Sequence, residues 1–360
     1  MLVERKYLTH ILLSLILSLS SYYLNWIDLA FAAAPDANVI DALDEAGRVK
    51  RDQLNRVIAV DLRHLPVDLA TLETLLTLKN IRSLQLAGTD LSARDLSIIA
   101  ELKSLQSLDL RGCEFDTAGF QSFQQLEKLK VLRLSGKEIA TRLTPEDVST
   151  LMEIDSLRAL LLDFFPISDR AVKNITKHTK LRELGLAGTE ITDSSVPDLF
   201  QMPQLKKLRL ANTKITGKGL ATSGPDSQIV DLDISSCSKF DERHLKHLEQ
   251  ITQLSKLNLY DCRITDQGVR HLENLSDLKW LNLDKTSITD HALQSVGQLF
   301  QLEFLHIGST QITAEGLPQL TALKRLNRLI ITETPVTDDE AKAFAGKNPS
   351  IKLQFGPKKP

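Results

Sequence analysis

A pattern of aliphatic residues recurs about every 24 residues along most of this chain, and it constrains the fold more than any other feature. Aligned on L-x-x-L-x-L, the repeats are 24 or 25 residues apart, except for one spacing of 28 between Leu129 and Leu157. The repeats begin at Val57, Ile81, Leu105, Leu129, Leu157, Leu181, Leu205, Ile229, Leu254, Leu278, Leu302 and Leu326, and a last strand is expected from Ile351 to Phe355. A chain of this length would ordinarily form two or three domains of about 150 residues, but a fixed internal period predicts stacked repeats instead.

The first half of each repeat has the period of a β-strand. In the repeat that begins at Leu181, Leu184 and Leu186 lie on one face, whereas Glu183 and Gly185 lie on the other. Each repeat is therefore expected to open with a short strand.

The second half changes to helical spacing. Val269, Leu272 and Leu275 are three residues apart, Thr265 is a typical N-cap, and Asp266 suits the positive end of a helix. One such unit cannot bury its own leucines, so neighbouring units must stack. The predicted fold class is α/β, a solenoid shaped as a horseshoe with parallel strands on the concave face and short helices on the convex face.

The quoted motifs carry a family resemblance. The pattern L-x-x-L-x-L-x-x-T/C-x-I-T-D-x-G-L over residues 57–355 resembles the leucine-rich repeat, in the T-D-x-G-L variant of secreted bacterial proteins, notably of planctomycetes, and of F-box-associated repeats. The resemblance implies a binding scaffold and leaves the ligand open, because such proteins bind diverse partners. A ubiquitin-ligase adaptor is disfavoured, since no F-box-sized segment lies between Pro35 and Val57.

The repeats define the expected domain organisation. Val39, Ile40 and Leu43 form one apolar face of a short capping helix that Gly47 ends, and the polar segment from Arg48 to Arg56 leads into the first strand. The expected segments are a signal peptide (1–34), an N-terminal helical cap (35–56), a solenoid of about twelve units plus a terminal strand (57–355) and a tail (356–360).

The first residues have the features of a secretory signal. Arg5 and Lys6 precede the apolar run from Ile11 to Leu19, and small residues follow from Ala30 to Ala34. We expect cleavage near Ala33 or Pro35 and a secreted, periplasmic or cell-envelope protein with no membrane span after cleavage. The alternative is an uncleaved membrane anchor, although the apolar run is shorter than the ~20 residues that a span needs. The sequons at Asn174 and Asn274 matter only in a eukaryotic secretory pathway.

Two repeats depart from the pattern. The 28-residue unit inserts residues before Thr144-Pro145-Glu146-Asp147, a strong helix start, and the unit of Leu205 replaces the end of its helix with Ser223-Gly224-Pro225-Asp226. Each is either a docking loop or a tolerated insertion on the convex side, and the second interpretation is preferred.

Composition and motifs exclude several function classes. The 44 basic and 46 acidic residues give a net charge of -2, which leaves no basic excess for nucleic acid. Phosphate-binding glycine loops and the common hydrolase and metalloprotease motifs are missing, so we expect no enzyme, no cofactor and no metal site. His244, His247 and His271 are expected on the solvated convex surface rather than around a metal.

The three cysteines share one position. Cys113, Cys237 and Cys262 are the ninth residues of their repeats, where other repeats have threonine, and this position should point inward. Free, buried thiols are expected, with a disulfide between Cys237 and Cys262 as the alternative.

The outward strand positions, namely the third, fifth and seventh of each repeat, change character along the chain. Early repeats present small or short residues such as Ser83, Gln85 and Asp109, whereas later ones present large or charged residues. Trp280 and Phe304 occupy the same position in adjacent repeats and should touch side by side. The candidate ligand-binding residues of the concave face are Lys207, Arg209, Asp231, Asp233, Lys256, Asn258, Tyr260, Trp280, Asn282, Asp284, Phe304, His306 and Arg328.

These residues favour a secreted, non-enzymatic scaffold that binds a protein or peptide, because aromatic residues and arginine are concentrated at the energetic centres of protein interfaces. The alternative is a carbohydrate or cell-envelope binding protein, in which Trp280 and Tyr260 would stack on a sugar and Asn282 would form a hydrogen bond to it.

Overall fold

The computed structural model describes residues 39–222, 224 and 226–357, so the expected signal peptide, the start of the cap, Ser223 and Pro225 lie outside the described residues. The described chain divides into two compact units, one that ends at Leu129 and one that begins at Lys130. In each unit, strands lie on one side and short helices on the other, and the strands of the repeats are parallel, which confirms the predicted α/β solenoid class.

The first unit contains the cap and the first repeats. Its main strands pair in the order β1-β2-β3-β5, and β4 pairs with β6 in a small separate sheet. The elements are α2 (Val39–Glu45), β1 (Val49–Arg51), β2 (Val57–Asp61), α3 (Leu69–Leu76), β3 (Ser83–Gln85), β4 (Asp90–Leu91), α4 (Ala93–Ile99), β5 (Ser107–Arg111), β6 (Glu114–Phe115) and the 3₁₀ helix η1 (Thr117–Gln125).

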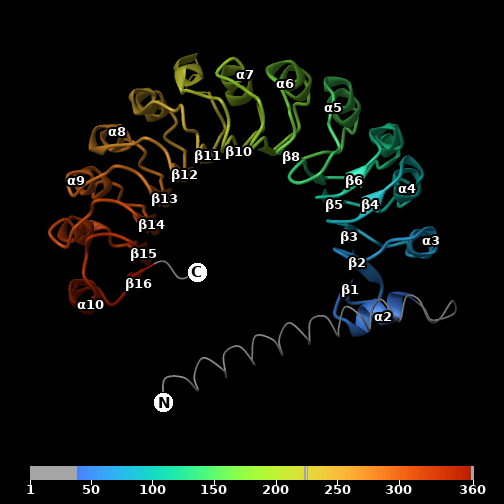
Figure 1. Ribbon diagram of the computed structural model, residues 1–360, viewed down its shortest axis with the longest axis horizontal. Coiled ribbons are helices and arrows are strands. Elements are labelled where there is room, and N and C mark those ends of the chain that lie inside the picture. Colours follow the sequence, from blue (N-terminus) through green and yellow to red (C-terminus); the bar gives the residue numbers. More distant parts are fainter. Residues whose placement is uncertain (1–38, 223, 225, 358–360) are drawn as a thin grey trace. The chain divides into compact units, whose positions relative to one another are not determined.

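The second unit continues the same alternation, and its strands pair in sequence order from β7 to β16. Within this unit the strands follow the inner side of an arc and the helices follow the outer side (Figure 1), so its strand face is concave. The strands are β7 (Val131–Ser135), β8 (Ala159–Asp163), β9 (Glu183–Gly185), β10 (Lys207–Arg209), β11 (Asp231–Asp233), β12 (Lys256–Asn258), β13 (Trp280–Asn282), β14 (Phe304–His306), β15 (Arg328–Ile330) and β16 (Lys352–Gln354). The helices are α5 (Pro145–Met152), α6 (Asp169–Ile175), α7 (Val196–Phe200), η2 (Lys218–Thr222), η3 (Glu242–Gln250), α8 (Asp266–Arg270), α9 (Ala292–Val296), η4 (Leu317–Ala322) and α10 (Asp338–Lys347).

The core consists of the aliphatic residues that define the repeat. In the repeat of β13, Leu278, Leu281 and Leu283 are all completely buried. Since a strand alternates its side chains between two faces, the residues between these leucines point to the other side of the sheet. The repeat pattern therefore fixes which side chains are available for binding.

After most strands the chain turns through a residue in the left-handed backbone region. This residue is the eighth of its repeat, as at Asn212 (φ 52°), Lys285 (φ 57°) and Phe164 (φ 63°), whereas in the repeat of Leu129 it is the tenth, Glu138 (φ 64°). Its backbone N–H donates a hydrogen bond to the next repeat, for example from Lys285 to the carbonyl oxygen of Gly308 at 3.1 Å. A bond between repeats thus holds each turn, although this conformation is unfavourable for residues other than glycine.

Carboxylates at the helix starts link the repeats on the helical side. The carboxylate of Asp290 accepts hydrogen bonds from the backbone N–H of Thr313 at 2.8 Å and from its hydroxyl at 2.6 Å. Asp266 accepts the same pair of bonds from Thr289, both at 2.7 Å. Further bonds of this kind join Asp169 to Thr192, Asp193 to Thr216 and Glu242 to Thr265. The aspartate of one repeat therefore binds the threonine of the next repeat and links the two.

Several local predictions are confirmed. Thr265 caps α8, and Thr144 caps α5 through a reciprocal capping box with Asp147. The helix α2 buries Ile40 and Leu43, and the chain turns at Gly47 with φ 69°.

The polar segment from Arg48 to Arg56, expected to lead into the first strand, also contains a strand that the sequence did not predict. This strand is β1, which pairs antiparallel with β2. The turn between them is held by Asp52, whose carboxylate accepts bonds from the backbone N–H groups of Leu54 and Arg56 and from the Arg56 guanidinium. These bonds lower the pKa of Asp52 to about 2. A strand of three residues with two exposed side chains carries too little periodicity to be recognised in the sequence.

We expect Asp290→Ala to destabilise the second unit by about 2 kcal/mol, because it removes two hydrogen bonds to a charged acceptor and leaves Thr313 without its partner. Urea unfolding followed by circular dichroism measures the effect. The control is Asp277→Ala, which removes an exposed carboxylate from the loop before β13. Equal midpoints for the two variants would show that the carboxylate bonds between repeats contribute nothing.

Candidate binding face

The strands of the second unit align their outward residues in rows. From β9 to β16 the first residues of the strands pair in register, as in Lys256 with Trp280, Trp280 with Phe304, and Phe304 with Arg328. We call this set the first-residue row: Glu183, Lys207, Asp231, Lys256, Trp280, Phe304, Arg328 and Lys352. All of its members are exposed or half-buried, as expected for the side of the sheet opposite the core.

The two aromatic residues of the row form a stack. The rings of Trp280 and Phe304 are 4.9 Å apart between centroids and nearly parallel, with 6° between their planes. The guanidinium carbon of Arg328 lies 5.5 Å from the Phe304 centroid and extends the stack to the next strand. The predicted contact between Trp280 and Phe304 is confirmed, and it creates a flat, half-exposed apolar surface across two strands.

Tyr260 lies two residues beyond the end of β12 and is also half-buried. The ammonium group of Lys285 lies 5.3 Å from the centre of its ring. The contact with Tyr260 raises the pKa of Lys285, which favours the cationic form of this lysine.

Charged residues dominate the neighbouring strands β8 to β12. Arg209 forms ion pairs with Asp163 at 2.8 Å and with Asp233 at 3.3 Å. In the first-residue row, Lys207 pairs with Glu183 at 3.9 Å and Lys256 pairs with Asp231 at 3.8 Å. These strands therefore neutralise most of their own charge.

A hollow of about 200 Å³ lies among these charges. Its floor is open because Gly185 has no side chain: a Cβ there would approach Leu161 Cγ to 3.1 Å and Asp163 Oδ1 to 3.0 Å. The lining residues are Leu161, Glu183, Leu184, Gly185, Lys207, Leu208, Arg209, Asp231 and Asp233. Only the four charged residues of β10 and β11 were predicted from the sequence. Leu161, Glu183 and Gly185 were not, because the prediction selected large or charged residues in the later repeats.

The structure corrects the assignment of Asp284 to the ligand-binding set. Asp284 is only 2% exposed, and its carboxylate lies 3.8 Å from Nε2 of His306. Other seventh residues are also buried, such as Ala187, Ala211 and Ser235, whereas Arg63 and Arg111 at this position are exposed. Tyr260, also at the seventh position, is half-buried. Asn258, Asn282 and His306, at the fifth position, are half-buried as expected for outward residues.

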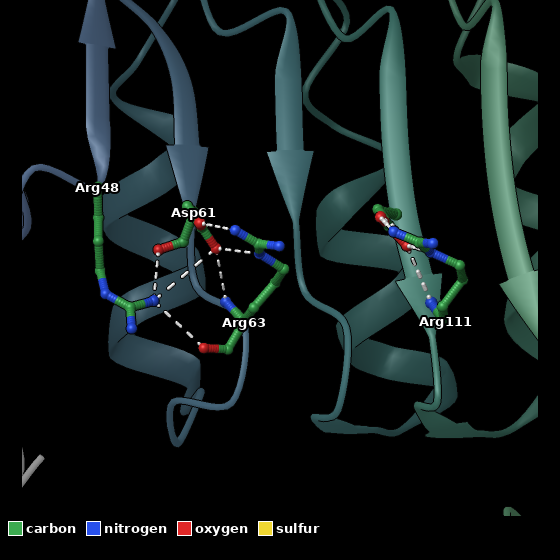
Figure 2. Close-up of polar contacts among 5 residues, drawn as sticks. Arg48, Asp61, Arg63 and Arg111 are labelled. Atoms are coloured by element: carbon green, nitrogen blue, oxygen red, sulfur yellow. Dashed lines mark hydrogen bonds and ion pairs between the residues drawn. The ribbon is translucent and has the colours of Figure 1, made fainter. Parts of the chain in front are cut away.

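The first unit carries arginine–aspartate pairs that were not predicted from the sequence (Figure 2). Arg63 forms two hydrogen bonds to Asp61, at 2.9 and 2.6 Å, and Arg111 binds Asp109 in the same way. Arg48 donates to the carbonyl oxygens of Asp61 and Arg63. Asp109 was expected to be an exposed short residue, but it is 4% exposed and paired. Arginine at the seventh position folds back on the aspartate two residues earlier, which the repeat pattern alone does not indicate.

The cysteines are buried and free, in the inward position predicted for them. Each thiol donates to a main-chain carbonyl of the preceding repeat, for example from Cys262 to Ile234 at 3.2 Å. Burial raises the pKa of Cys262 to about 12, so its reactive thiolate form is suppressed at neutral pH. The alternative of a disulfide between Cys237 and Cys262 does not occur in the structure.

On the helical side, the histidine rings of His244 and His247 stack at 5.8 Å, and His271 contacts Glu249 at 2.8 Å. Among the described residues, no group of three or more histidine, cysteine or acidic side chains is placed to hold a metal ion. Over the same residues, no helix has the length and apolar character needed to cross a bilayer.

The buried carboxyl of Asp163 provides a test of the charged region. Burial raises its pKa above the ordinary 3.8, while Arg209 and the N–H of Ala187 oppose the shift. A carboxyl whose pKa is raised in the folded state makes the folded protein less stable as the pH rises through that pKa. We therefore expect Arg209→Met to lower the free energy of unfolding by about 2 kcal/mol at pH 7 and by much less at a pH well below the ordinary carboxyl pKa of 3.8, where Asp163 is protonated.

Urea midpoints at the two pH values measure this difference. The double variant Asp163→Asn/Arg209→Met is the control, because it has no carboxyl at residue 163 and should lose the pH-dependent part of the deficit. The same deficit for Arg209→Met at both pH values would contradict the assigned role of Arg209.

Comparisons with known proteins agree with this geometry. The family model described as "Leucine Rich Repeat" matches residues 104–126. No curated protein sequence matches the chain at a significant level. An internalin (inlF) from Listeria monocytogenes has a similar structure, with a TM-score of 0.55 and 18% identity over 91% of this chain and 96% of that chain.

Two further solved structures are similar with lower scores. The protein LIC12759 of Leptospira interrogans, a leucine-rich repeat protein, has a TM-score of 0.44 and 18% identity over 83% of this chain and 90% of that chain. The plant peptide hormone receptor RGFR1, solved in complex with RGF2, has a TM-score of 0.44 and 15% identity over 86% of this chain and 52% of that chain. The matched repeat and the internalin structure show that the chain has the leucine-rich repeat fold.

Proposed function

We propose that this protein is a secreted, non-enzymatic scaffold that binds a protein or peptide on the strand face of its second unit, centred on Trp280. The observation that carries the proposal is the stack of Trp280 on Phe304 at outward strand positions, 4.9 Å apart. The hydrophobic core needs neither ring, because the core lies on the other side of the sheet. Aromatic residues in such positions are typical anchors of protein interfaces.

Rigidity of the face supports the same function. Every strand from β8 to β15 pairs with a neighbour on both sides, so its outward side chains are held before a partner arrives. A preorganised surface loses little conformational entropy on binding. The Asn and His side chains at the fifth position supply hydrogen-bonding groups beside the aromatic pair.

We further infer that the repeats are of the T-D-x-G-L variant that resembles secreted bacterial proteins of planctomycete type. The inference is supported by Thr-Asp pairs at the helix starts, whose carboxylates bond to the threonine of the next repeat.

Secretion rests on the first residues of the chain. If a signal peptidase removes the segment that ends in Ala32-Ala33-Ala34, protein exported by the source cells should begin near Ala33 or Pro35. N-terminal sequencing of the exported protein measures this. The control is Leu15→Arg, which places a charge in the apolar run and should keep the full chain inside the cell. Exported protein that still begins at Met1 would contradict cleavage.

The aromatic pair provides the test of binding. A photo-crosslinking residue in place of Phe304 should capture a protein partner in the source cells, and that partner, once purified, should bind Trp280→Ala and Phe304→Ala about thirtyfold more weakly than the unaltered protein. Truncation of a buried aromatic anchor typically costs about 2 kcal/mol, which corresponds to this factor. Isothermal titration measures the affinities, and circular dichroism verifies that each variant is folded.

The matched control is Phe300, which is 56% exposed and lies outside the strands of the sheet. A crosslinker at residue 300 should capture nothing specific, and Phe300→Ala and Gln85→Ala should bind normally. Equal capture from residues 300 and 304, or normal binding by both aromatic variants, would place the recognition surface elsewhere. A glycan as the captured ligand would favour a carbohydrate-binding protein.

A further inference from the structure

The first-residue row changes its charge pattern partway along the second unit. From β9 to β12 it alternates in sign, with Glu183, Lys207, Asp231 and Lys256. Glu183 pairs with Lys207 at 3.9 Å, and Asp231 pairs with Lys256 at 3.8 Å. From β13 onward it continues with Trp280, Phe304, Arg328 and Lys352. The aromatic pair is therefore followed by two cations, whereas the earlier part of the row neutralises itself.

Arg328 and Lys352 are direct neighbours in the sheet. They pair in register on β15 and β16, and both are exposed. Neither forms an ion pair with a carboxylate of the described residues. Like charges placed opposite one another on adjacent strands are destabilising, so an external anion at this place would be stabilised by both cations.

The position of Arg328 couples this cationic site to the aromatic surface. Its guanidinium carbon lies 5.5 Å from the centre of the Phe304 ring, so one face of the guanidinium is close to the stack. The edges of a guanidinium carry its N–H donors and suit a carboxylate. A ligand could thus place an apolar group on Trp280 and Phe304 and an anion on Arg328 and Lys352 at the same time.

We propose that the partner presents an acidic peptide segment, in which an apolar side chain covers Trp280 and Phe304 and a carboxylate about three residues away pairs with Arg328 and Lys352. This inference rests on the proposed function and specifies the chemistry of its ligand. The middle of the aromatic pair and the middle of the cationic pair are two strand spacings apart, about 10 Å. An extended or polyproline II peptide covers this distance in about three residues, and in polyproline II residues three apart point to the same side.

The test uses a display library of random short peptides, which does not require the partner to be identified. The library is selected against the mature protein at low salt, with Trp280→Ala used in parallel. Among peptides that depend on Trp280, we expect enrichment of Asp or Glu two to four residues from an aromatic or aliphatic residue. Their affinity should fall at least about tenfold in Arg328→Glu/Lys352→Glu, and selection on this variant should favour Lys and Arg instead.

The matched control is Lys324→Glu/Lys347→Glu, which makes the same charge change on exposed lysines near η4 and α10, away from the strands. It should leave the selected sequences and affinities unchanged. Binding of the acidic peptides should also weaken between about 0.05 and 0.5 M salt in the unaltered protein and much less in the Arg328 and Lys352 double variant.

The outcomes separate this inference from the proposed function. Peptides that depend on Trp280 but show no acidic preference, or that bind the Arg328 and Lys352 double variant normally, would overturn the acidic ligand and leave the binding face intact. An equal effect of the control variant would also overturn it. If no selected peptide depends on Trp280, the proposed function fails as well.

Discussion

Leucine and isoleucine side chains at the first, fourth and sixth positions of each repeat are buried only because the neighbouring repeats cover them. One repeat has too little apolar area to fold alone, so each depends on the next. Once the repeats stack, the strands must pair in register, and the register decides which outward side chains are neighbours. The contact of Trp280 with Phe304 follows directly from this constraint.

Hydrogen bonds between neighbouring repeats also stabilise the stack, both at the turn after each strand and at the start of the helix. Main-chain bonds at the left-handed eighth residue fix the turn after the strand, and carboxylates such as Asp266 and Asp290 fix the start of the next helix. These bonds recur at the same positions because every repeat presents the same unsatisfied backbone groups. The candidate binding face gains its rigidity from both sets, and a rigid face would bind a partner with a smaller entropic cost.

Charge divides the strand face of the second unit into two regions. On β8 to β12, acids and bases face one another, and Arg209 serves two aspartates at once. On β13 to β16, the aromatic pair and two neighbouring cations have no such compensation among the described residues. The first region contributes mainly to its own stability, and the second has the apolar area and the unpaired charge from which affinity for a partner is built.

The 24-residue period determined the α/β repeat class, the inward position of the three cysteines and the contact between Trp280 and Phe304, because a fixed period assigns equivalent positions to equivalent places. Three features depended on the tertiary structure. Asp284 is buried at a position where the first repeat exposes an arginine. The strand β1 forms because β2 offers it an edge, and Arg209 lies between Asp163 and Asp233 because three strands bring them together. A repeat pattern predicts the face of the sheet to which a side chain points. It does not predict whether other residues bury that side chain or which charged residue lies beside it. Those properties arise only when distant segments pack, which is why the sequence predicted a candidate binding face and the tertiary structure decided which of its residues are exposed.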